Sequence, residues 1–444
     1  MNVLRRQPVD REILRLAVPA LGALVAEPLF LLADSAMIGH LGAVPLAGLG
    51  IASAVLQTII GLMIFLAYST TPTVARLLGA GDTRSAVSAG VSSTWLALGL
   101  GLVLAVAGWV SAPALVAAFG AAPDVAVAAS AYLTVSMLGL PAMLIVFAAT
   151  GLLRGLQDTR TPLLVAGVGF AANVALNFVF IYGLGLGIVG SAVGTVVAQW
   201  GMVAVYAAVV IRHTRRAGAS LLPHRAGLLH TAGSGGWLFV RTASLRAAMV
   251  LAVAVATRLG SPELAAFQVA MTVFGTLAFA LDALAIAAQA LIGRALGASR
   301  LDEVRAVLRR CLQWGVLAGL TLGLVTVALS PVAARAFTND PSVVALLPIA
   351  LVIVGIGVPL GGYVFVLDGV LIGAGDARYL AWTGVLNVAV FVPLAIAVAV
   401  WSPGGVIGLA WLTAAFALGY IGARAVTLGL RSRGSRWMVA GARR

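Results

Sequence analysis

Apolar stretches of about twenty residues or more recur along the whole chain, separated by short breaks rich in Gly, Pro, Asp and Arg. A helix needs roughly 20 apolar residues to cross the hydrocarbon core of a bilayer. Because lipid offers the backbone no hydrogen-bond partners, such segments must be helical. Of the 444 residues, 61% are hydrophobic and 9% are charged, whereas soluble domains carry about 25% charged residues. These features exclude a water-soluble globule and predict an all-α polytopic membrane protein.

The apolar runs bounded by these breaks predict about twelve transmembrane helices. We place them at 13–38, 46–74, 88–112, 125–150, 161–182, 188–211, 236–257, 265–292, 306–330, 343–371, 379–401 and 405–428. The first run follows several Arg residues, as in a signal peptide, but it is longer than the apolar core of such a peptide. We therefore interpret it as a retained first span.

Arginine is distributed unevenly between the loops that join these runs. Arg-rich segments fall in alternate loops, at 76–84, 154–160, 212–225, 294–310 and 378. Arg residues also occur at both ends of the chain. Cytoplasmic loops of membrane proteins carry an excess of Arg and Lys, so we attribute the net charge of +14 to topology rather than to nucleic-acid binding. The pattern predicts a multi-pass protein of the cell (inner) membrane with both termini in the cytoplasm.

The second half of the chain repeats features of the first half at a shift of 218 residues. The most informative matches are Arg76 with Arg294, Pro113 with Pro331, Pro141 with Pro359, Asp158 with Asp376, and Arg160 with Arg378. An even number of spans in each half gives both halves the same orientation, related by an axis along the membrane normal. We predict two six-helix bundles, an N-lobe at 1–212 and a C-lobe at 236–430, with a basic connector at 213–235 and a basic tail at 431–444. Two such lobes are typical of an alternating-access transporter.

Three loops on the predicted cytoplasmic side share the pattern Gly-x-x-Asp-x-Arg, beginning at Gly79, Gly155 and Gly373. Gly can end one helix and Asp can cap the next. We interpret these loops as tight turns between helices.

No motif in the chain indicates an enzyme or a cofactor. Residues 185–190 match the glycine pattern of dinucleotide-binding proteins, but they lie between two predicted spans and follow no strand. Walker, metal-spaced His or Cys, and nucleophile-elbow motifs do not occur. The sequence therefore predicts a transporter without cofactor, metal or catalytic residues.

Asp34 is an ionisable residue inside the predicted first span. A charged group at that depth is costly, so it is a functional candidate by default. Burial disfavours the charged form of a carboxyl, which would let it bind and release a proton near neutral pH. Pro19 makes the same helix bendable, because proline removes a backbone hydrogen bond. Asp34 is thus the candidate proton carrier with Pro19 as a hinge; the alternative is a purely structural hydrogen bond between helices.

Three further polar residues of the first half rank behind Asp34. Glu27 lies two turns earlier, where Glu27-Pro28 could form a kink beside a wet cavity. Asn173 and Asn177 are one helical turn apart and share a face, so their amides could contact a carboxyl such as Asp34. Considered alone, the two Asn are better explained as hydrogen-bonding contacts between helices.

The second half contributes Asp282 and Asp368, either of which could form a structural salt bridge with Arg241 or Arg246. Weaker candidates for lining a substrate cavity, with helix packing as the alternative, are Gln57, Gln199, Gln268, Gln289 and Tyr68.

Several of these segments carry a resemblance to a known family. They are Leu16–Pro19, Asp34–Gly42, Arg154–Pro162, Asn173 with Asn177, and Asp368–Gly373. Over essentially the whole chain, the sequence resembles the multidrug and toxic compound extrusion (MATE) family, and within it the DinF-type branch. The resemblance implies two six-helix bundles that export organic, often cationic or amphipathic compounds in exchange for protons or sodium ions. It also implies that Asp34 matches the coupling carboxylate and that Asn173 and Asn177 line the same cavity.

Two positions depart from the family pattern. Some DinF-type relatives carry Asp where this chain has Asn177, which leaves the proton stoichiometry open. The seventh-span Glu of the NorM-type branch has no counterpart near 241–246, which weakens the case for a sodium site in the C-lobe.

The working hypothesis is a monomeric antiporter of the membrane that exports a small-molecule substrate in exchange for protons. Sodium coupling is one alternative. Others are a flippase of lipid-linked precursors, which a strongly cationic cavity would favour, and a non-transporting scaffold, which would not need Asp34.

Overall fold

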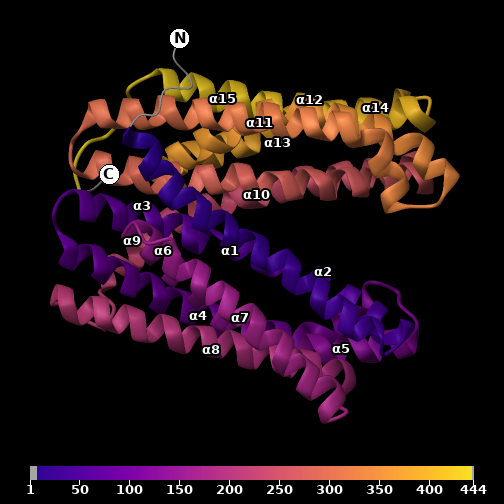
Figure 1. Cartoon of the computed structure of the whole chain (residues 1–444), viewed down its shortest axis with the longest axis horizontal. Coiled ribbons are helices and arrows are strands. Elements are labelled where there is room, and N and C mark those ends of the chain that lie inside the picture. The colour runs from indigo at the N-terminus through magenta and orange to yellow at the C-terminus, as the bar shows by residue number, and fades with distance from the viewer. Residues whose placement is uncertain (1–7, 443–444) are drawn as a thin grey trace. The chain divides into compact units, whose positions relative to one another are not determined.

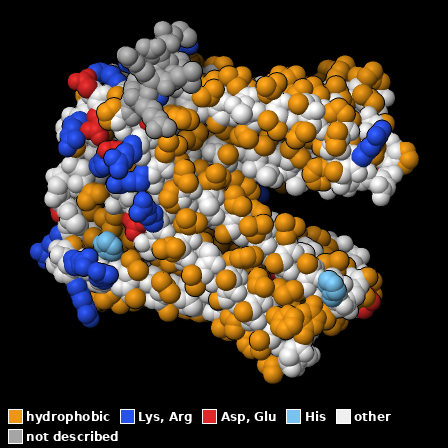
Figure 2. All heavy atoms as spheres, viewed as in Figure 1, with side chains coloured by type: hydrophobic (Ala, Val, Ile, Leu, Met, Phe, Trp, Pro, Cys, Tyr) orange, Lys and Arg blue, Asp and Glu red, His pale blue; other side chains and the backbone are white. Residues whose placement is uncertain are grey.

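The computed structural model describes residues 8–442, and helices make up nearly all of this part of the chain. Twelve of its helical segments are long and apolar enough to cross a membrane, which confirms the predicted all-α fold. The first seven residues of the predicted N-lobe and the last two of the predicted tail lie outside the described residues. Apolar side chains cover the helices along their length, and in each half Arg side chains gather at one end (Figure 2).

The first six spans contain three interruptions of regular α-helix. Their elements are α1 (Pro8–Gly39), α2 (Ala43–Met63) with α3 (Phe65–Gly79), α4 (Thr83–Ala117), α5 (Pro123–Ser136) with the 3₁₀ turn η1 (Met137–Gly139) and α6 (Leu140–Gly155), α7 (Arg160–Phe178) with the π-helical turn η2 (Val179–Gly183), and α8 (Gly187–Ala217).

The last six spans are regular except for the twelfth. They are α9 (Arg225–Leu259), α10 (Ser261–Gly297), α11 (Leu301–Phe337), α12 (Pro341–Gly373), α13 (Ala377–Trp401), and α14 (Gly405–Ala414) with the π-helical turn η3 (Ala415–Tyr420) and α15 (Ile421–Arg433). Most helices extend several residues beyond the apolar run that predicted them.

The chain divides into two compact units, each described here by itself. The N-unit comprises residues 18–235, and the C-unit comprises residues 8–17 together with 236–442. These bounds differ from the predicted lobes at the start of α1. There, Asp10 accepts hydrogen bonds from Arg310 and from Nε1 of Trp314, and Glu12 pairs with Arg294 at 2.6 Å. Ion pairs near its N-terminus thus hold the start of α1 against α10 and α11.

The connector and the tail also differ from their predicted ranges. Only residues 218–224 of the predicted connector, 213–235, are non-helical, because α8 ends at Ala217, is followed by Gly218 in a left-handed conformation, and α9 begins at Arg225. The predicted tail, 431–444, begins inside α15. Trp437 is fully buried, and the N–H of Gly441 donates to the Leu296 carbonyl, so this segment packs on the C-unit.

In the C-unit, α10, α11 and α12 run alongside one another (Figure 1). Gly315, Gly319 and Gly323 repeat every fourth residue along the face of α11 that meets α12. A Cβ at Gly319 would lie 2.8 Å from the Val358 carbonyl oxygen. Small residues at this spacing let transmembrane helices approach closely. The backbones of α11 and α12 therefore form the seam of this unit.

Two of the Gly-x-x-Asp-x-Arg loops show the predicted Asp capping directly. Asp82 precedes α4 and accepts a hydrogen bond from the N–H of Ser85 at 2.9 Å. Asp158 accepts from the N–H groups of Arg160 and Thr161 at the start of α7. In the third loop, Asp376 instead pairs with Arg431 at 2.7 Å.

Candidate functional site

Asp34 lies near the end of α1, where its side chain meets three other helices of the N-unit. The residue is 2% exposed. Its carboxylate accepts hydrogen bonds from Tyr132 of α5 at 3.2 Å, from Asn177 of α7 at 3.0 Å, and from the hydroxyl of Ser191 of α8. Four helices from distant parts of the sequence thus converge on one carboxyl group.

The wall of this site formed by α7 and α8 is a ladder of amide and hydroxyl groups. Asn177 also donates to the side-chain oxygen of Asn173 at 3.2 Å, and Asn173 donates to Thr195 at 3.0 Å. Because both pairs, Asn173 with Asn177 and Ser191 with Thr195, have a spacing of four residues, each pair shares one helix face. The ladder holds Asn177 against Asp34. Asn173 belongs to the ladder but bonds to Thr195 and Asn177 instead of the carboxylate.

Two glycines allow α7 and α8 to approach closely enough for this ladder. A Cβ at Gly190 would lie 2.7 Å from the Phe180 carbonyl oxygen, and one at Gly194 would lie 3.0 Å from the Asn177 backbone nitrogen. The pair forms the small-xxx-small pattern of close membrane-helix contacts. The π-helical turn η2 begins just after Phe178, and such turns occur frequently at functional sites.

The surroundings of Asp34 carry no compensating charge. All three of its hydrogen-bond partners are neutral, and Asp34 takes part in none of the ion pairs within residues 8–442. A buried carboxylate without a cation must rely on hydrogen bonds for its stabilisation, which makes neutralisation by a proton or a bound cation favourable. Residues 8–442 contain no group of three or more His, Cys, Asp or Glu that could hold a metal ion.

The other N-unit candidates are not among the hydrogen-bond partners of Asp34. Glu27 and Gln57 are exposed, and Tyr68 is half-buried. Gln199 packs against Gly139 of η1, which fits the packing interpretation. Pro19 and Pro28 lie within α1, which continues as a helix through both.

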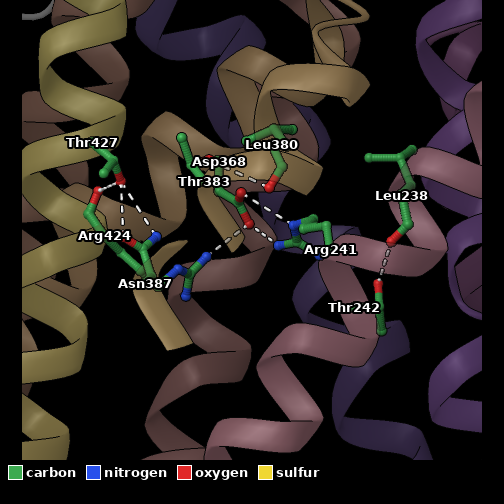
Figure 3. A network of polar contacts seen from close by, with 9 residues as sticks. All are labelled: Leu238, Arg241, Thr242, Asp368, Leu380, Thr383, Asn387, Arg424 and Thr427. Atoms are coloured by element: carbon green, nitrogen blue, oxygen red, sulfur yellow. Dashed lines mark hydrogen bonds and ion pairs between the residues drawn. The ribbon is translucent and has the colours of Figure 1, made fainter. Parts of the chain in front are cut away.

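A second buried polar cluster lies in the C-unit, where Asp368 of α12 contacts two guanidinium groups (Figure 3). Arg241 of α9 forms an ion pair with Asp368 and donates from Nε to Oδ1 at 3.2 Å. Arg424 of α15 donates to Oδ2 at 3.2 Å. All three residues are less than one-tenth exposed.

The remaining C-unit candidates differ from these in burial. Arg246, the alternative partner in the sequence, is exposed, as is Gln268, while Asp282 is half-buried. Gln289 is buried. The pairing of Asp368 therefore involves the deeply buried Arg241, and the structure adds Arg424, which the sequence had not indicated.

Comparison with protein families decides the identity of the fold. The MatE family model matches residues 19–179 and again residues 241–401. The chain belongs to the MATE family. One match falls in each half of the chain, in agreement with the internal repeat, and the resemblance found in the sequence is confirmed.

Named relatives of this MATE chain come from plants and bacteria. Protein DETOXIFICATION 43 of Arabidopsis thaliana is 30% identical, over 96% of this chain and 91% of the relative. DNA damage-inducible protein F of Escherichia coli (strain K12) is 28% identical, over 82% of this chain and 81% of the relative. A solved structure of a mutant of the Vibrio cholerae MATE transporter VcmN superposes with a TM-score of 0.88 at 22% identity, covering 96% and 98% of the two chains, and shows the shared fold. The chain is thus a multi-pass membrane protein of a family of multidrug efflux transporters.

Sequence reasoning missed four residues that this MATE structure brings into the two clusters: Tyr132, Ser191, Thr195 and Arg424. One signal was available, because Ser191 and Thr195 have the same four-residue spacing as Asn173 and Asn177 on the neighbouring span. Tyr132 and Arg424 had no such signal, since Tyr is common near membrane interfaces and Arg424 lies within ten residues of the basic end of the chain.

Proposed function

We propose that this MATE transporter exports small organic cations or amphipathic compounds in exchange for protons, with Asp34 as the residue that exchanges the proton. The supporting observation is the burial of Asp34 among three neutral hydrogen-bond donors on a helix with two internal prolines. The transporter acts as a monomer in the cell membrane, with both termini in the cytoplasm.

Protonation would change the hydrogen bonds that hold α1 in the N-unit. A charged Asp34 only accepts hydrogen bonds, whereas a protonated one also donates one. The Ser191 hydroxyl would then accept a bond that it now donates, and Asn177 would retain Asn173 as an acceptor. Charge-assisted bonds are about twice as strong as neutral ones, so protonation loosens the attachment of α1 to α5, α7 and α8. Pro19 and Pro28 let α1 bend in response.

Sodium coupling is the second candidate, and one observation favours it. In the described part of the chain, the side-chain oxygen of Asn177 is buried and has no hydrogen-bond partner. With the Asn177 amide rotated, this oxygen would join those of Asp34, Ser191 and Thr195 as ligands of the kind that hard cations prefer. The proton remains our first choice because the amide nitrogen, not the oxygen, of Asn177 faces Asp34.

The decisive experiment is substrate exchange in proteoliposomes with a pH gradient and a sodium gradient imposed separately. A fluorescent organic cation such as ethidium serves as the substrate. We expect the pH gradient alone to drive exchange and Asp34→Asn to abolish it. Asp302→Asn, which changes a fully exposed carboxylate on α11, is the matched control and should transport normally. Exchange by the Asp34→Asn protein at the normal rate would contradict the proposal, and exchange driven only by sodium would replace the proton with sodium.

A further inference from the structure

We propose that a surface of the N-unit, at the end of α8 and the start of α9, binds the anionic phospholipid headgroups of the membrane leaflet that it faces. This connector surface is defined by Arg212, Arg215, Arg216, Leu221, Leu222 and Arg225. The inference goes beyond the proposed function and does not depend on it, because the binding is measured without transport.

The four Arg residues of the connector surface are exposed. Arg212, Arg215 and Arg216 have the i, i+3, i+4 spacing that places side chains on one face of a helix, here α8. Arg225 follows at the start of α9. In the part of the chain that the structure describes, none of the four guanidinium groups takes part in an ion pair. They form a basic segment of the kind that anionic headgroups attract.

Other helices that follow Arg-rich loops begin beside an acid, whereas α9 does not. Asp82 precedes α4, Asp158 caps α7, Asp302 lies in the first turn of α11, and Asp376 precedes α13. The first turn of α9 has no acidic residue, and the sequence contains no Asp or Glu from 159 to 262. The excess of positive charge at the connector surface is therefore local, rather than a general property of the Arg-rich loops.

Two leucines beside these charges face outward. Leu221 is 44% exposed and Leu222 is 69% exposed. The segment that follows the last span differs, because it buries its Trp437 completely. Segments that bind membrane surfaces combine basic residues with apolar side chains that enter the boundary between headgroups and acyl chains. The exposed leucines thus favour a lipid surface over an acidic protein or a nucleic acid as the partner.

Trp95 of α4 fixes the level of this loop. Its Nε1 donates to the Leu221 carbonyl at 2.9 Å, and Nδ1 of His224 hydrogen-bonds with the Ser88 hydroxyl at 3.3 Å. Trp95 is itself exposed, and Trp is enriched at the level of the headgroups. Ser88 and Trp95 also lie at the start of the predicted third span, 88–112. These contacts hold the connector surface where headgroups are expected.

The first test is binding of dioctanoylphosphatidylglycerol to the purified full-length protein in neutral detergent, counted by native mass spectrometry. Dioctanoylphosphatidylcholine is the zwitterionic counterpart and should bind more weakly. The triple variant Arg212→Gln, Arg215→Gln and Arg216→Gln should weaken the tightest binding of phosphatidylglycerol about a hundredfold. Each Arg near an anionic surface contributes about a fivefold factor.

A second triple variant, Arg300→Gln, Arg305→Gln and Arg309→Gln, is the matched control. It removes the same charge from exposed positions of the C-unit, two of which are paired with acids. It should bind phosphatidylglycerol as the parent does. Because all six side chains are exposed, both variants should melt within a few degrees of the parent.

The second test follows the loop itself with a bimane label at Leu222→Cys. Cys311 is fully buried and should add little background. We expect the emission to shift to shorter wavelength when phosphatidylglycerol is added to phosphatidylcholine nanodiscs, and this shift to be lost in the first triple variant. Bimane at Leu186→Cys, an exposed position just before α8, should emit equally in both nanodiscs.

Three outcomes would overturn the proposal. One is equal affinity for the two lipids, and another is an equal loss in the two triple variants. Displacement of phosphatidylglycerol by inorganic phosphate at constant ionic strength would identify a free phosphate site instead. A polyglutamate peptide that binds in phosphatidylcholine nanodiscs and competes with phosphatidylglycerol would assign the surface to an acidic protein and would equally contradict lipid binding.

Discussion

At the scale of single residues, the chemistry of the N-unit depends on what surrounds Asp34. A carboxylate in the membrane costs several kcal/mol unless it is solvated or hydrogen-bonded. Here Tyr132, Asn177 and Ser191 provide the bonds without adding charge. Each donor stabilises the ionised form of Asp34 more than the protonated form. The stability that is lost when one donor is removed should therefore be larger at a pH where Asp34 is ionised than at a pH where it is protonated.

Ser191→Ala tests that dependence. We expect proton-driven exchange to fall and the free energy of unfolding to decrease by about 1.5–3 kcal/mol where Asp34 is ionised. The loss should shrink as the pH is lowered, because a protonated carboxyl gains less from the Ser191 donor. Thermal unfolding of both proteins in detergent across a pH series measures this loss of stability. Ser111→Ala removes a hydroxyl that bonds only within α4 and should show no such trend; equal losses at every pH in Ser191→Ala would contradict the expectation.

At the scale of elements, close helix packing and helix caps stabilise this fold. The α11–α12 seam depends on the absence of side chains at three successive small positions, Gly315, Gly319 and Gly323. The helix ends depend on side chains in the loops, as at Asp82 before α4. Both contributions are local enough to be tested by single substitutions.

Gly319→Ala should destabilise the C-unit, because its Cβ would meet backbone atoms of Val358 and Pro359 at 2.8 Å. Overpacking of this kind costs about 1–3 kcal/mol. Gly422→Ala in α15 is the matched control, since nothing lies within 4 Å of its Cβ position, and alanine there should be neutral or stabilising by up to about 1 kcal/mol. Equal melting temperatures of the two variants would argue against a backbone-to-backbone seam.

Asp82→Ala should destabilise α4 in a pH-dependent manner. Hydrogen bonds from the side chain and the N–H of Ser85 lower the pKa of Asp82 below its usual value. A lowered pKa in the folded state means that the stabilisation is present above the pKa of the unfolded chain, about 3.9, and is lost as the pH falls through the folded value. The variant should therefore melt at a lower temperature than the parent at pH 7, and the difference should shrink as the pH is lowered through the folded-state pKa. A difference that stays the same at every pH would show that the cap does not act through the charged carboxylate.

At the scale of the whole molecule, the distribution of Arg predicts which side of the membrane each loop faces. Within each unit, Arg side chains gather at one end (Figure 2). Cys311, the one cysteine of the chain, is fully buried. The native protein should therefore react little with a membrane-impermeant maleimide, which makes single introduced cysteines informative.

Ser299→Cys and Ala122→Cys place exposed thiols in loops at opposite ends of the spans. We expect the impermeant maleimide to label Ala122→Cys in intact cells and Ser299→Cys only in inverted membrane vesicles. The parent chain, with Cys311 alone, measures the background. Labelling of Ser299→Cys in intact cells would reverse the predicted orientation.

The sequence by itself determined the number and type of the spans, because the need to satisfy backbone hydrogen bonds in lipid acts on each apolar run separately. It also identified Asp34, Asn177, Asp368 and Arg241, since a charged or amide group within a span is costly wherever it lies. Only the tertiary structure decided which of these groups meet. Tyr132, Ser191 and Arg424 became parts of the two clusters through the rotation of each helix about its axis. For Ser191, the close approach that Gly190 and Gly194 allow between α8 and the fifth span also contributes. Those depend on contacts between distant segments, which periodicity and composition along one chain do not record.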